Sequence, residues 1–365
     1  MNHLIEEQSQ LKELEPLLNQ LSDQAGHIAV DTEFLREKTY NAKLCLVQLG
    51  IGEDQYCIDV LAIEDLSILA ELFVNENIIK IFHAARQDME VLYQTLHVMP
   101  KPIFDTQLAA AFCGMDMQLG YAALVKERLG IELSKSQART DWTRRPLSEE
   151  QVSYAADDVV YLEHLYLTGL GDLKEQGKLA WYEEEIDNFY DGDKYIIDPA
   201  TAYLRLFGGG LKINQQYTLK ALAEWRERIA QKRNIPRTWV LKDDRLFDLA
   251  AHRPMTQEAV EKLNVFGKKS AKHMAHAVID LISNTEIKDK LIWNRVEPLD
   301  KKDKSQCTVM MKELASIAKH EKIAQGLLAT RKDIESLYRN KKSEKLIGTW
   351  RETIVGKQLL ALVDD

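Results

Sequence analysis

The pattern of apolar and polar residues divides the chain into two parts that differ in character. In the first part, short apolar runs rich in β-branched residues predict strands at 27–34, 44–49, 55–60, 78–82 and 103–105. A Gly-rich turn separates the second run from the third, so the first three strands should form an antiparallel meander. Helical segments around the later runs imply βαβ crossovers, which predicts an α/β domain with a mixed sheet covered by helices.

After residue 210 the strand signals end and apolar residues recur at helical spacing. This pattern predicts helices at 219–231, 245–251, 256–263 and from 267 to about 283, and residues 288–365 continue it too weakly to define a repeat. Asp198-Pro199 and the triple glycine at 208–210 indicate a connecting segment before these helices. We therefore expect an α/β domain at 1–195, a linker at 196–211 and two small all-α domains at 212–287 and 288–365.

A helix of the first part is predicted to begin at Ser148, where Ser-Glu-Glu-Gln forms a capping box. Apolar residues between Val152 and Leu162 then recur at helical spacing and give the helix a buried face. Tyr154 and Asp158 are four residues apart and share a different face. Asp157 lies about 100° further around the helix and should point away from them.

Composition narrows the class of protein. The chain has 365 residues, 45% hydrophobic and 29% charged, which indicates a soluble globular protein of two or three domains. No apolar run is long enough to cross a membrane, and the first residues lack the features of a secretory signal. The four cysteines are far apart without a Cys-x-x-Cys pair, which predicts reduced thiols and a cytoplasmic location.

The net charge of −9 conceals an asymmetry between the two parts. Residues 1–210 carry −19 and residues 211–365 carry +10. An acidic part joined to a basic part is typical of proteins that bind polyanions, including nucleic acid. Ordinary solvated surfaces would explain the same numbers, so charge alone leaves both interpretations open.

Three acidic positions are candidates for metal binding. Asp31 and Glu33 are two residues apart in a strand and point to the same face, where a cation would relieve their repulsion. Asp88 follows a strand exit, after His83, which we expect to be a packed histidine. Taken singly, each has an ordinary explanation, a solvated strand end for the pair and a macrodipole partner for Asp88. Their oxygens are the hard ligands that Mg²⁺ and Mn²⁺ prefer.

In combination, these positions resemble one family. Asp31-x-Glu33, Asp88 and Tyr154-x-x-x-Asp158 resemble the motifs of the DEDD exonucleases in their tyrosine-bearing subclass. The segments that resemble ribonuclease D more specifically are Val30–Phe34 with Tyr40, Leu46–Leu49, Phe82–Ala84, Phe104–Gln107, Ala111–Gly114, Lys135–Trp142 and Arg144–Leu147. The resemblance covers residues 25–170, and residues 214–285 resemble the helical HRDC domain found in ribonuclease D and some helicases. It implies a ribonuclease H-like mixed-sheet exonuclease domain followed by two small all-α, HRDC-like domains, the second with the looser fit.

The resemblance also implies a reaction. The chain would be a metal-dependent 3′→5′ exoribonuclease that releases nucleoside 5′-monophosphates, trims tRNA precursors and other small structured RNA 3′ ends, and acts as a monomer. Two divalent ions, Mg²⁺ or Mn²⁺, would serve phosphodiester hydrolysis. Asp31, Glu33 and Asp158 would hold one ion, Asp31 would bridge to the second near Asp88, and Tyr154 would orient the attacking water.

Three alternatives remain open. The motifs do not specify the sugar, so a DNA exonuclease of the same superfamily fits them. A non-catalytic nucleic-acid-binding scaffold is disfavoured because all four carboxylates and the tyrosine are present. An accessory role beside a helicase fits the HRDC-like helices, although the sequence lacks a P-loop of the usual kind for a motor of its own.

Several cations are candidates for contacts to nucleic acid. They are Lys135, Arg139 and Arg145 near the predicted centre, and Lys268, Lys269 and Lys272 beside a glycine at a predicted helix N-terminus. Ordinary surface cations would explain each of them equally well. Gln48 and Trp142 are expected to be structural.

Overall fold

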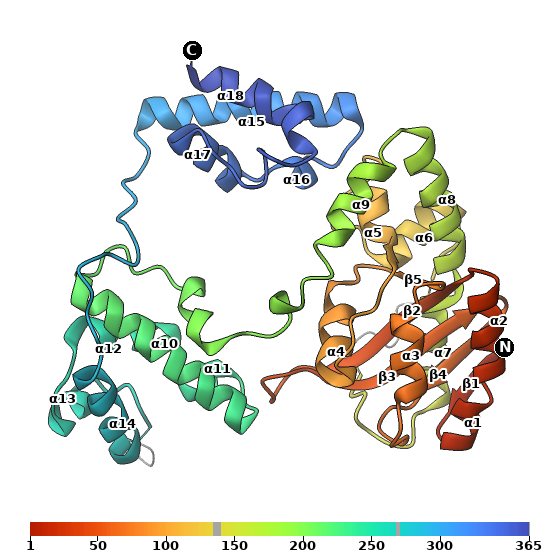
Figure 1. Cartoon of the computed structure of the whole chain (residues 1–365), viewed down its shortest axis with the longest axis horizontal. Helices are drawn as coiled ribbons and strands as arrows, with labels where there is room; N and C mark the ends of the chain where they lie inside the picture. Colours follow the sequence, from red (N-terminus) through yellow and green to blue (C-terminus); the bar gives the residue numbers. More distant parts are fainter. Residues whose placement is uncertain (134–139, 268–270, 365) are drawn as a thin grey trace. The chain divides into compact units, whose positions relative to one another are not determined.

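The structure, a computed structural model, describes residues 1–133, 140–267 and 271–364 of the chain. Figure 1 draws the whole chain, coloured along the sequence. The chain divides into two compact units. Unit 1 contains residues 1–35, 44–192 and 299–365, and unit 2 contains residues 36–43 and 193–298. The sheet and the last helices therefore belong to one unit, a division that differs from the linear one expected from the sequence.

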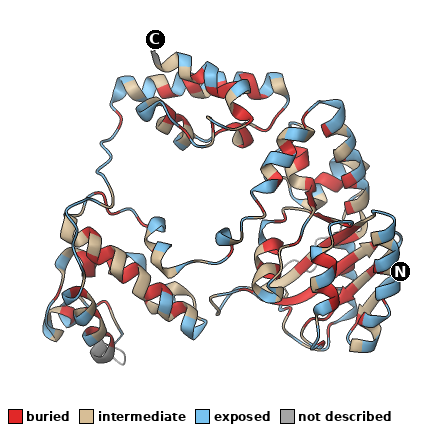
Figure 2. Cartoon of the chain, viewed as in Figure 1, coloured by how far each residue is buried: buried red, intermediate tan, exposed pale blue. Residues whose placement is uncertain are grey.

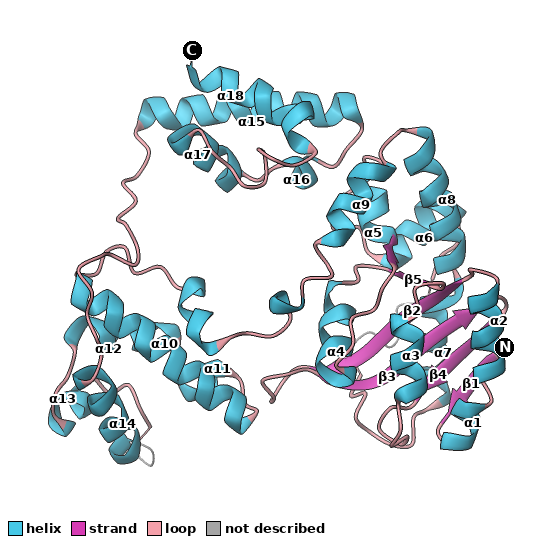
Figure 3. Cartoon of the chain, viewed as in Figure 1, coloured by secondary structure: helices cyan, strands magenta, loops and turns pink. Residues whose placement is uncertain are grey.

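Unit 1 is built on a six-stranded mixed sheet in the order β1-β4-β3-β2-β5-β6 (Figure 3). The strands are β1 (Asn2–Ile5), β2 (His27–Leu35), β3 (Lys43–Ile51), β4 (Asp54–Ile58), β5 (Ile79–Phe82) and β6 (Ile103–Asp105). β3 and β4 pair antiparallel, as the meander predicted, while β2, β5 and β6 pair in parallel. The sequence did not predict β1, whose four residues begin with two polar ones and pair in parallel with β4.

Helices flank this sheet, and the buried residues concentrate along its strands (Figure 2). The helices are α1 (Gln8–Lys12), α2 (Glu15–Asp23), α3 (Ser67–Val74), α4 (Arg86–Leu96), α5 (Thr106–Phe112), α6 (Tyr121–Leu129), α7 (Glu149–Val160), α8 (Leu162–Glu175) and α9 (Leu179–Asp187). The capping box predicted at Ser148 is present, because its hydroxyl accepts from Gln151 N at 3.2 Å and its N–H donates to Gln151 Oε1 at 3.0 Å. The box fixes the start of α7, which packs on β2 and β4.

Unit 2 contains the first helical domain. After η1 (Gly192–Lys194), its elements are η2 (Pro199–Arg205), α10 (Ile213–Arg233), α11 (Arg237–Val240), α12 (Asp243–His252), α13 (Gln257–Lys262) and α14 (Ala271–Ser283). Within the linker expected at 196–211 the structure has η2, and Leu206 is buried in the same core as Leu222. Trp293 also packs on this core, so the domain extends beyond the expected boundary at 287. Burial of apolar side chains therefore holds this segment in the domain, although its turn-forming residues suggested a free linker.

The second helical domain contains α15 (Lys301–Glu321), α16 (Gln325–Leu328), α17 (Arg331–Asn340), η3 (Glu352–Gly356) and α18 (Lys357–Asp364). Its first three helices have the same lengths as α10, α11 and α12, and each begins 88 residues after its counterpart. The left-handed residues that end α10 and α12, Asn234 and Arg253, recur at the same spacing as Lys322 and Lys341. The backbone of α10–α12 is thus repeated without insertion or deletion.

The second helical domain packs on the α/β domain through buried polar groups. Lys178, 4% exposed, donates from Nζ to Lys322 O at 2.9 Å, and Ala324 N donates to Ala111 O at 2.8 Å. Arg351 forms an ion pair with Glu185 at 2.6 Å. These contacts explain why the last helices belong to the same unit as the sheet. Among the described residues, no helix is both long enough and apolar enough to span a membrane.

Candidate metal centre

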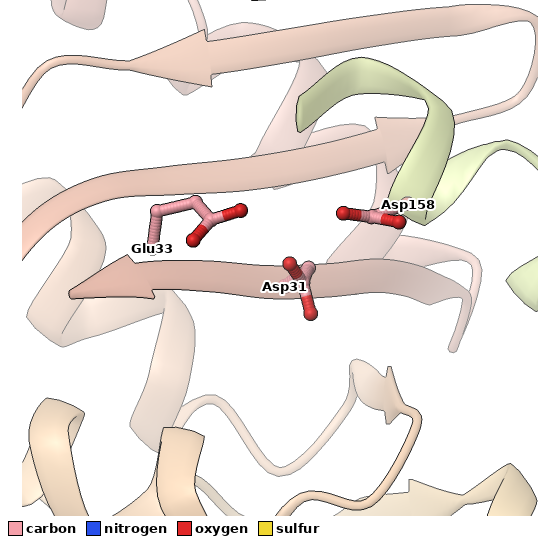
Figure 4. A group of neighbouring side chains, drawn as sticks. All are labelled: Asp31, Glu33 and Asp158. Atoms are coloured by element: carbon pink, nitrogen blue, oxygen red, sulfur yellow. The ribbon is translucent and has the colours of Figure 1, made fainter. Parts of the chain in front are cut away.

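Three carboxylates from two distant segments converge beside the sheet. Asp31 and Glu33 lie on one face of β2, as strand alternation requires, and Asp158 reaches them from α7 (Figure 4). Each offers an oxygen, and these three oxygens lie within 4.8 Å of one another. This spacing is suitable for binding a divalent cation, and carboxylate oxygens are the ligands that Mg²⁺ and Mn²⁺ prefer.

A glycine allows α7 to approach the sheet closely enough to bring Asp158 to this position. A Cβ added at Gly50 of β3 would lie 3.1 Å from Ala29 Cβ and 3.2 Å from Val159 O. Val159 follows Asp158 directly, so any larger residue at position 50 would push against the turn that carries the carboxylate. The sequence gives no sign of this role of Gly50, because only the packed helix shows what the glycine adjoins.

Asp88 lies in the first turn of α4 and outside the group of three, but close enough to act on it electrostatically. It is 6% exposed and accepts a hydrogen bond from Thr32 Oγ1 at 2.5 Å. Its charge is one cause of the raised pKa of Asp31 and of Glu33. Asp31, Glu33, Asp88 and Asp158 are called the acidic centre below.

A buried carboxylate at the end of β6 fixes the turn that places Asp88. Asp105, 3% exposed, accepts hydrogen bonds from Ala84 N at 3.1 Å and Ala85 N at 3.0 Å. Ala84 has a φ of 60°, a left-handed conformation that is costly for alanine and that these bonds help to hold. Asp105 also caps α5, which explains why a charged residue is retained in this interior position. In the sequence, Asp105 stands out only as part of the segment Phe104–Gln107 that resembles ribonuclease D.

Burial without a counter-charge shifts the titration of the whole acidic centre. Burial, followed by the charges of Asp158 and Asp88, raises the pKa of Glu33 from 4.5 to about 8. Burial likewise raises the pKa of Asp158 to about 7 and that of Asp88 to about 7. The pKa of Asp31 is raised well above its ordinary value by burial and then by its three neighbours. A bound cation would replace the missing counter-charge, which is the reason that the arrangement fits a metal.

Tyr154 lies on α7 one turn before Asp158 and faces the acidic centre. Burial raises its pKa above the ordinary value of 10, and the charges of Asp158, Glu33 and Asp31 raise it further. Its ring is 6.3 Å from that of Trp142, which is 4% exposed. No hydrogen-bond partner of the Tyr154 hydroxyl is found among the described residues, so the phenol is held by packing while its hydroxyl remains available.

The structure agrees with several structural interpretations made from the sequence. Asp157 is exposed and lies outside the acidic centre, as its place around the helix predicted. His83 has both ring nitrogens engaged, with Thr106 Oγ1 at 2.9 Å and Leu119 O at 3.0 Å. Trp142 and Gln48 are both buried. Tyr121, which the sequence did not indicate, donates to Asp157 O at 3.2 Å and accepts from Tyr161 N at 3.1 Å, bracing the end of α7.

Arg145, one of the candidates for a phosphate contact, is engaged within the protein. Its guanidinium forms a bidentate ion pair with Asp59, whose side chain is fully buried, and also donates to the carbonyls of Cys45, Trp142 and Arg144. All five N–H donors of the guanidinium can be accounted for by these acceptors. Arg145 therefore ties the segment before α7 to the sheet and has no donor left over for phosphate.

The other predicted cations cannot be compared with the structure in the same way. Lys135, Arg139, Lys268 and Lys269 lie outside the described residues. Lys272 belongs to α14, and only its backbone is described. Their contacts to nucleic acid stay predictions.

Comparisons with known proteins bear on both units. The sequence profile of a 3′-5′ exonuclease family matches residues 2–168, and that of the HRDC domain matches residues 215–282. Ribonuclease D of Zymomonas mobilis is 37% identical over 359 residues, covering 96% of this chain and 92% of the relative. Ribonuclease D of Bartonella henselae is 32% identical over 364 residues, covering 98% and 89%.

A solved structure extends this likeness from the sequence to the fold. The crystal structure of Escherichia coli RNase D, described as an exoribonuclease involved in structured RNA processing, matches with a TM-score of 0.87 at 28% identity. The match covers 100% of this chain and 99% of that one, so it includes the α/β domain and the helices that follow it.

Proposed function

The chain belongs to the ribonuclease D family of hydrolytic 3′→5′ exoribonucleases, and we propose that it trims the 3′ ends of tRNA precursors and other small structured RNAs. The products are nucleoside 5′-monophosphates. The observation that supports this reaction is the convergence of Asp31, Glu33 and Asp158 within 4.8 Å, with Tyr154 facing them. The involvement of the E. coli enzyme in structured RNA processing supports structured RNA as the substrate class.

In this proposal, the acidic centre holds two divalent ions, Mg²⁺ or Mn²⁺. Asp31, Glu33 and Asp158 would hold the first, and Asp31 and Asp88 would hold the second. The ions supply charge neutralisation and an activated water when bound. Thr32 holds the orientation of Asp88, because its hydroxyl donates a hydrogen bond to one of the carboxylate oxygens.

Tyr154 orients the water that attacks the terminal phosphodiester. A phenol with a pKa above 10 remains protonated at neutral pH, so it acts as a hydrogen-bond donor and acceptor and not as a general base. Its ring is fixed against Trp142, which limits the positions of the hydroxyl. The role assigned to Tyr154 is therefore positional.

The enzyme is further proposed to act in the cytoplasm and as a monomer. No disulfide joins the described cysteines at 45, 57, 113 and 307, which supports the cytoplasm as the location. We propose that the enzyme acts as a monomer, and sedimentation of the purified chain would test this.

A single assay separates this function from its alternatives. The purified chain is incubated with a 3′-extended tRNA and a DNA of matched sequence, each with Mg²⁺, Mn²⁺ or EDTA. We expect stepwise shortening of the RNA only, with 5′-monophosphate products, and its loss on chelation. Shortening of the DNA as well would favour a DNA exonuclease, and binding without hydrolysis would favour a scaffold.

A further inference from the structure

We propose that a groove in the first helical domain binds single-stranded RNA, stacking a base on Trp239 and contacting phosphates through Arg233, Lys242 and Arg245. The inference rests on the proposed function for the identity of the ligand. It concerns a surface in unit 2 that the matches to known proteins do not assign. Below, this surface is called the Trp239 groove.

The groove is a cavity of about 350 Å³ lined by the end of α10, by α11, by the start of α12, and by residues 265–267 and Met274. That volume falls at the low end of the range for small-ligand sites. Val265, Phe266 and Met274 supply an apolar wall, while Trp239 and the three cations complete the lining. Apolar surface beside cations is the combination that single-stranded nucleic acid requires, since its bases stack and its phosphates carry charge.

Trp239 is held in an exposed position by its local backbone. Its side chain is 61% exposed, although indole is costly to leave in water. The one-turn helix α11 fixes it, with Trp239 N donating to Pro236 O at 2.8 Å and Leu241 N to Arg237 O at 3.0 Å. An exposed aromatic ring on an ordered backbone is a stacking platform for a base.

The charge of the groove is positive after its own ion pairs are considered. Arg233 and Lys242 are exposed, and no ion-pair partner is found for either among the described residues. Arg245 lies 3.6 Å from Asp244 and 3.4 Å from Asp248, so part of its charge is balanced. Asp244 also lines the groove, which leaves three cations against one carboxylate along the lining.

The second helical domain shows that the fold itself requires none of these side chains. At the spacing of 88 residues, Trp239 corresponds to Leu327, which is 2% exposed. The three cations correspond to Glu321, Thr330 and Asp333.

In that copy, the same corner serves a different purpose. Ala324, at the start of α16, donates to Ala111 O of the α/β domain, and residues 113–117 line a cavity with the corner. The position of the exposed Trp239 is thus occupied by a buried leucine in the other copy, and none of the three cations is kept there. The side chains of the Trp239 groove are therefore additions to a shared scaffold, as expected of a binding site.

Binding of the full chain to RNA tests the groove without catalysis. A labelled, unstructured oligoribonucleotide of about twelve nucleotides is titrated in EDTA, so that it stays intact. Trp239→Ala should weaken binding at least about fivefold, whereas Trp239→Phe should retain most of the affinity. Arg233→Ala and Lys242→Ala should each lower the slope of log affinity against log salt by about 0.7.

Controls separate the groove from general effects. Phe207→Ala removes another aromatic residue of unit 2, 57% exposed and outside the groove, and should leave affinity unchanged. Trp239→Leu introduces the residue of the other copy, and an unaltered unfolding midpoint would show that the domain remains folded. Equal affinity of Trp239→Ala and the parent, or an equal loss in Phe207→Ala, would overturn the proposal.

A second readout distinguishes this inference from the proposed function. Hydrolysis of a trinucleotide needs only the acidic centre, so Trp239→Ala should cleave it at the parent rate while cleaving long RNA more slowly. A parent that hydrolyses no RNA would refute the proposed function, yet a Trp239-dependent loss of binding in EDTA would still support the groove.

Discussion

The acidic centre and the Trp239 groove differ in how their charges are arranged. The acidic centre places four carboxylates in a poorly solvated position, where the charges of the other three raise the pKa of Asp31 and two of them raise that of Glu33. The groove displays its cations in water around an exposed ring. Buried charges interact strongly and depend on geometry, whereas exposed charges are screened and contribute in small increments. Substitutions should therefore have all-or-none effects at the centre and graded effects at the helical surface.

The largest effect is expected from removing a carboxylate of the centre. Asp31→Ala and Asp158→Ala should each abolish RNA hydrolysis, a loss of at least about 10³-fold, because the remaining oxygens cannot complete a metal site. Asp157→Ala is the matched control, since it removes a carboxylate from the same turn of α7 that lies outside the centre. Turnover of tRNA in Mg²⁺ measures all three, and a comparable loss in Asp157→Ala would contradict the assignment.

Glu33→Gln should also abolish activity while making the metal-free protein more stable. The pKa of Glu33 is raised from 4.5 to about 8, so the folded protein retains a proton that the unfolded chain releases. The contribution of Glu33 to stability is thus unfavourable and grows as pH rises from about 4.5 to about 8. Glutamine carries no such charge, so the variant should gain on the order of 1 kcal/mol at pH 8 and nothing at pH 4.

Unfolding of the parent and Glu33→Gln in EDTA, followed across this pH range, measures the difference. Added Mg²⁺ should stabilise the parent more than the variant, because only the parent keeps the complete ligand set. A variant that is less stable than the parent at pH 8 would show that Glu33 already has a favourable partner without metal.

Tyr154→Phe should have a smaller effect than the loss of a carboxylate. It removes a hydroxyl that we expect to position water but leaves the ring against Trp142, so kcat should fall about 10²-fold with RNA binding nearly intact. Single-turnover hydrolysis and binding in EDTA separate the two quantities. An unchanged kcat would remove the positioning role and leave Tyr154 a packing residue.

Gly50→Ala tests whether the centre depends on the close approach of α7. The added methyl group would press on Ala29 and on Val159, so Asp158 should shift by a few tenths of an ångström and kcat should fall about tenfold. Gly171→Ala is a suitable control, because it lies in α8 with nothing within 4 Å and should slightly favour the helix. Full activity in Gly50→Ala would mean that the centre tolerates movement of α7.

The predictions that the sequence supported were those governed by local geometry. Strand alternation put Asp31 and Glu33 on one face, and the capping box at Ser148 fixed the register of α7. Their convergence with Asp158 depends on packing at Gly50, a contact between segments far apart in sequence. The ion pair that Arg145 makes was hidden in the same way, since its partner Asp59 lies 86 residues away, and the sequence left Arg145 as a candidate for phosphate or an ordinary surface cation.

The repeated backbone of the two helical domains was also invisible in the sequence. Corresponding positions keep the same helix lengths but not the same residues, as with Arg226, which is buried and paired with Asp243, and its counterpart Leu314. A buried position can be filled by a paired polar side chain or by an apolar one, so the fold is retained although the sequences of the two domains differ. We propose on this ground that residues 299–365 form a second HRDC-like domain.

The smallest effect is expected from the lysines at 268, 269 and 272. It shows most directly whether RNA binding is confined to the first helical domain. Replacing all three by alanine should lower the slope of log affinity against log salt by about 0.7 for each phosphate that is no longer neutralised. Lys301, Lys302 and Lys304, three exposed lysines in the first turn of α15, provide a control of equal charge in the other helical domain. If RNA binds mainly at the first helical domain, only the first triple should change the slope. Equal changes would mean that positive charge spread over both helical domains attracts RNA without a defined site. The charges of the helical domains would then differ from those of the acidic centre in the range over which they act as well as in strength.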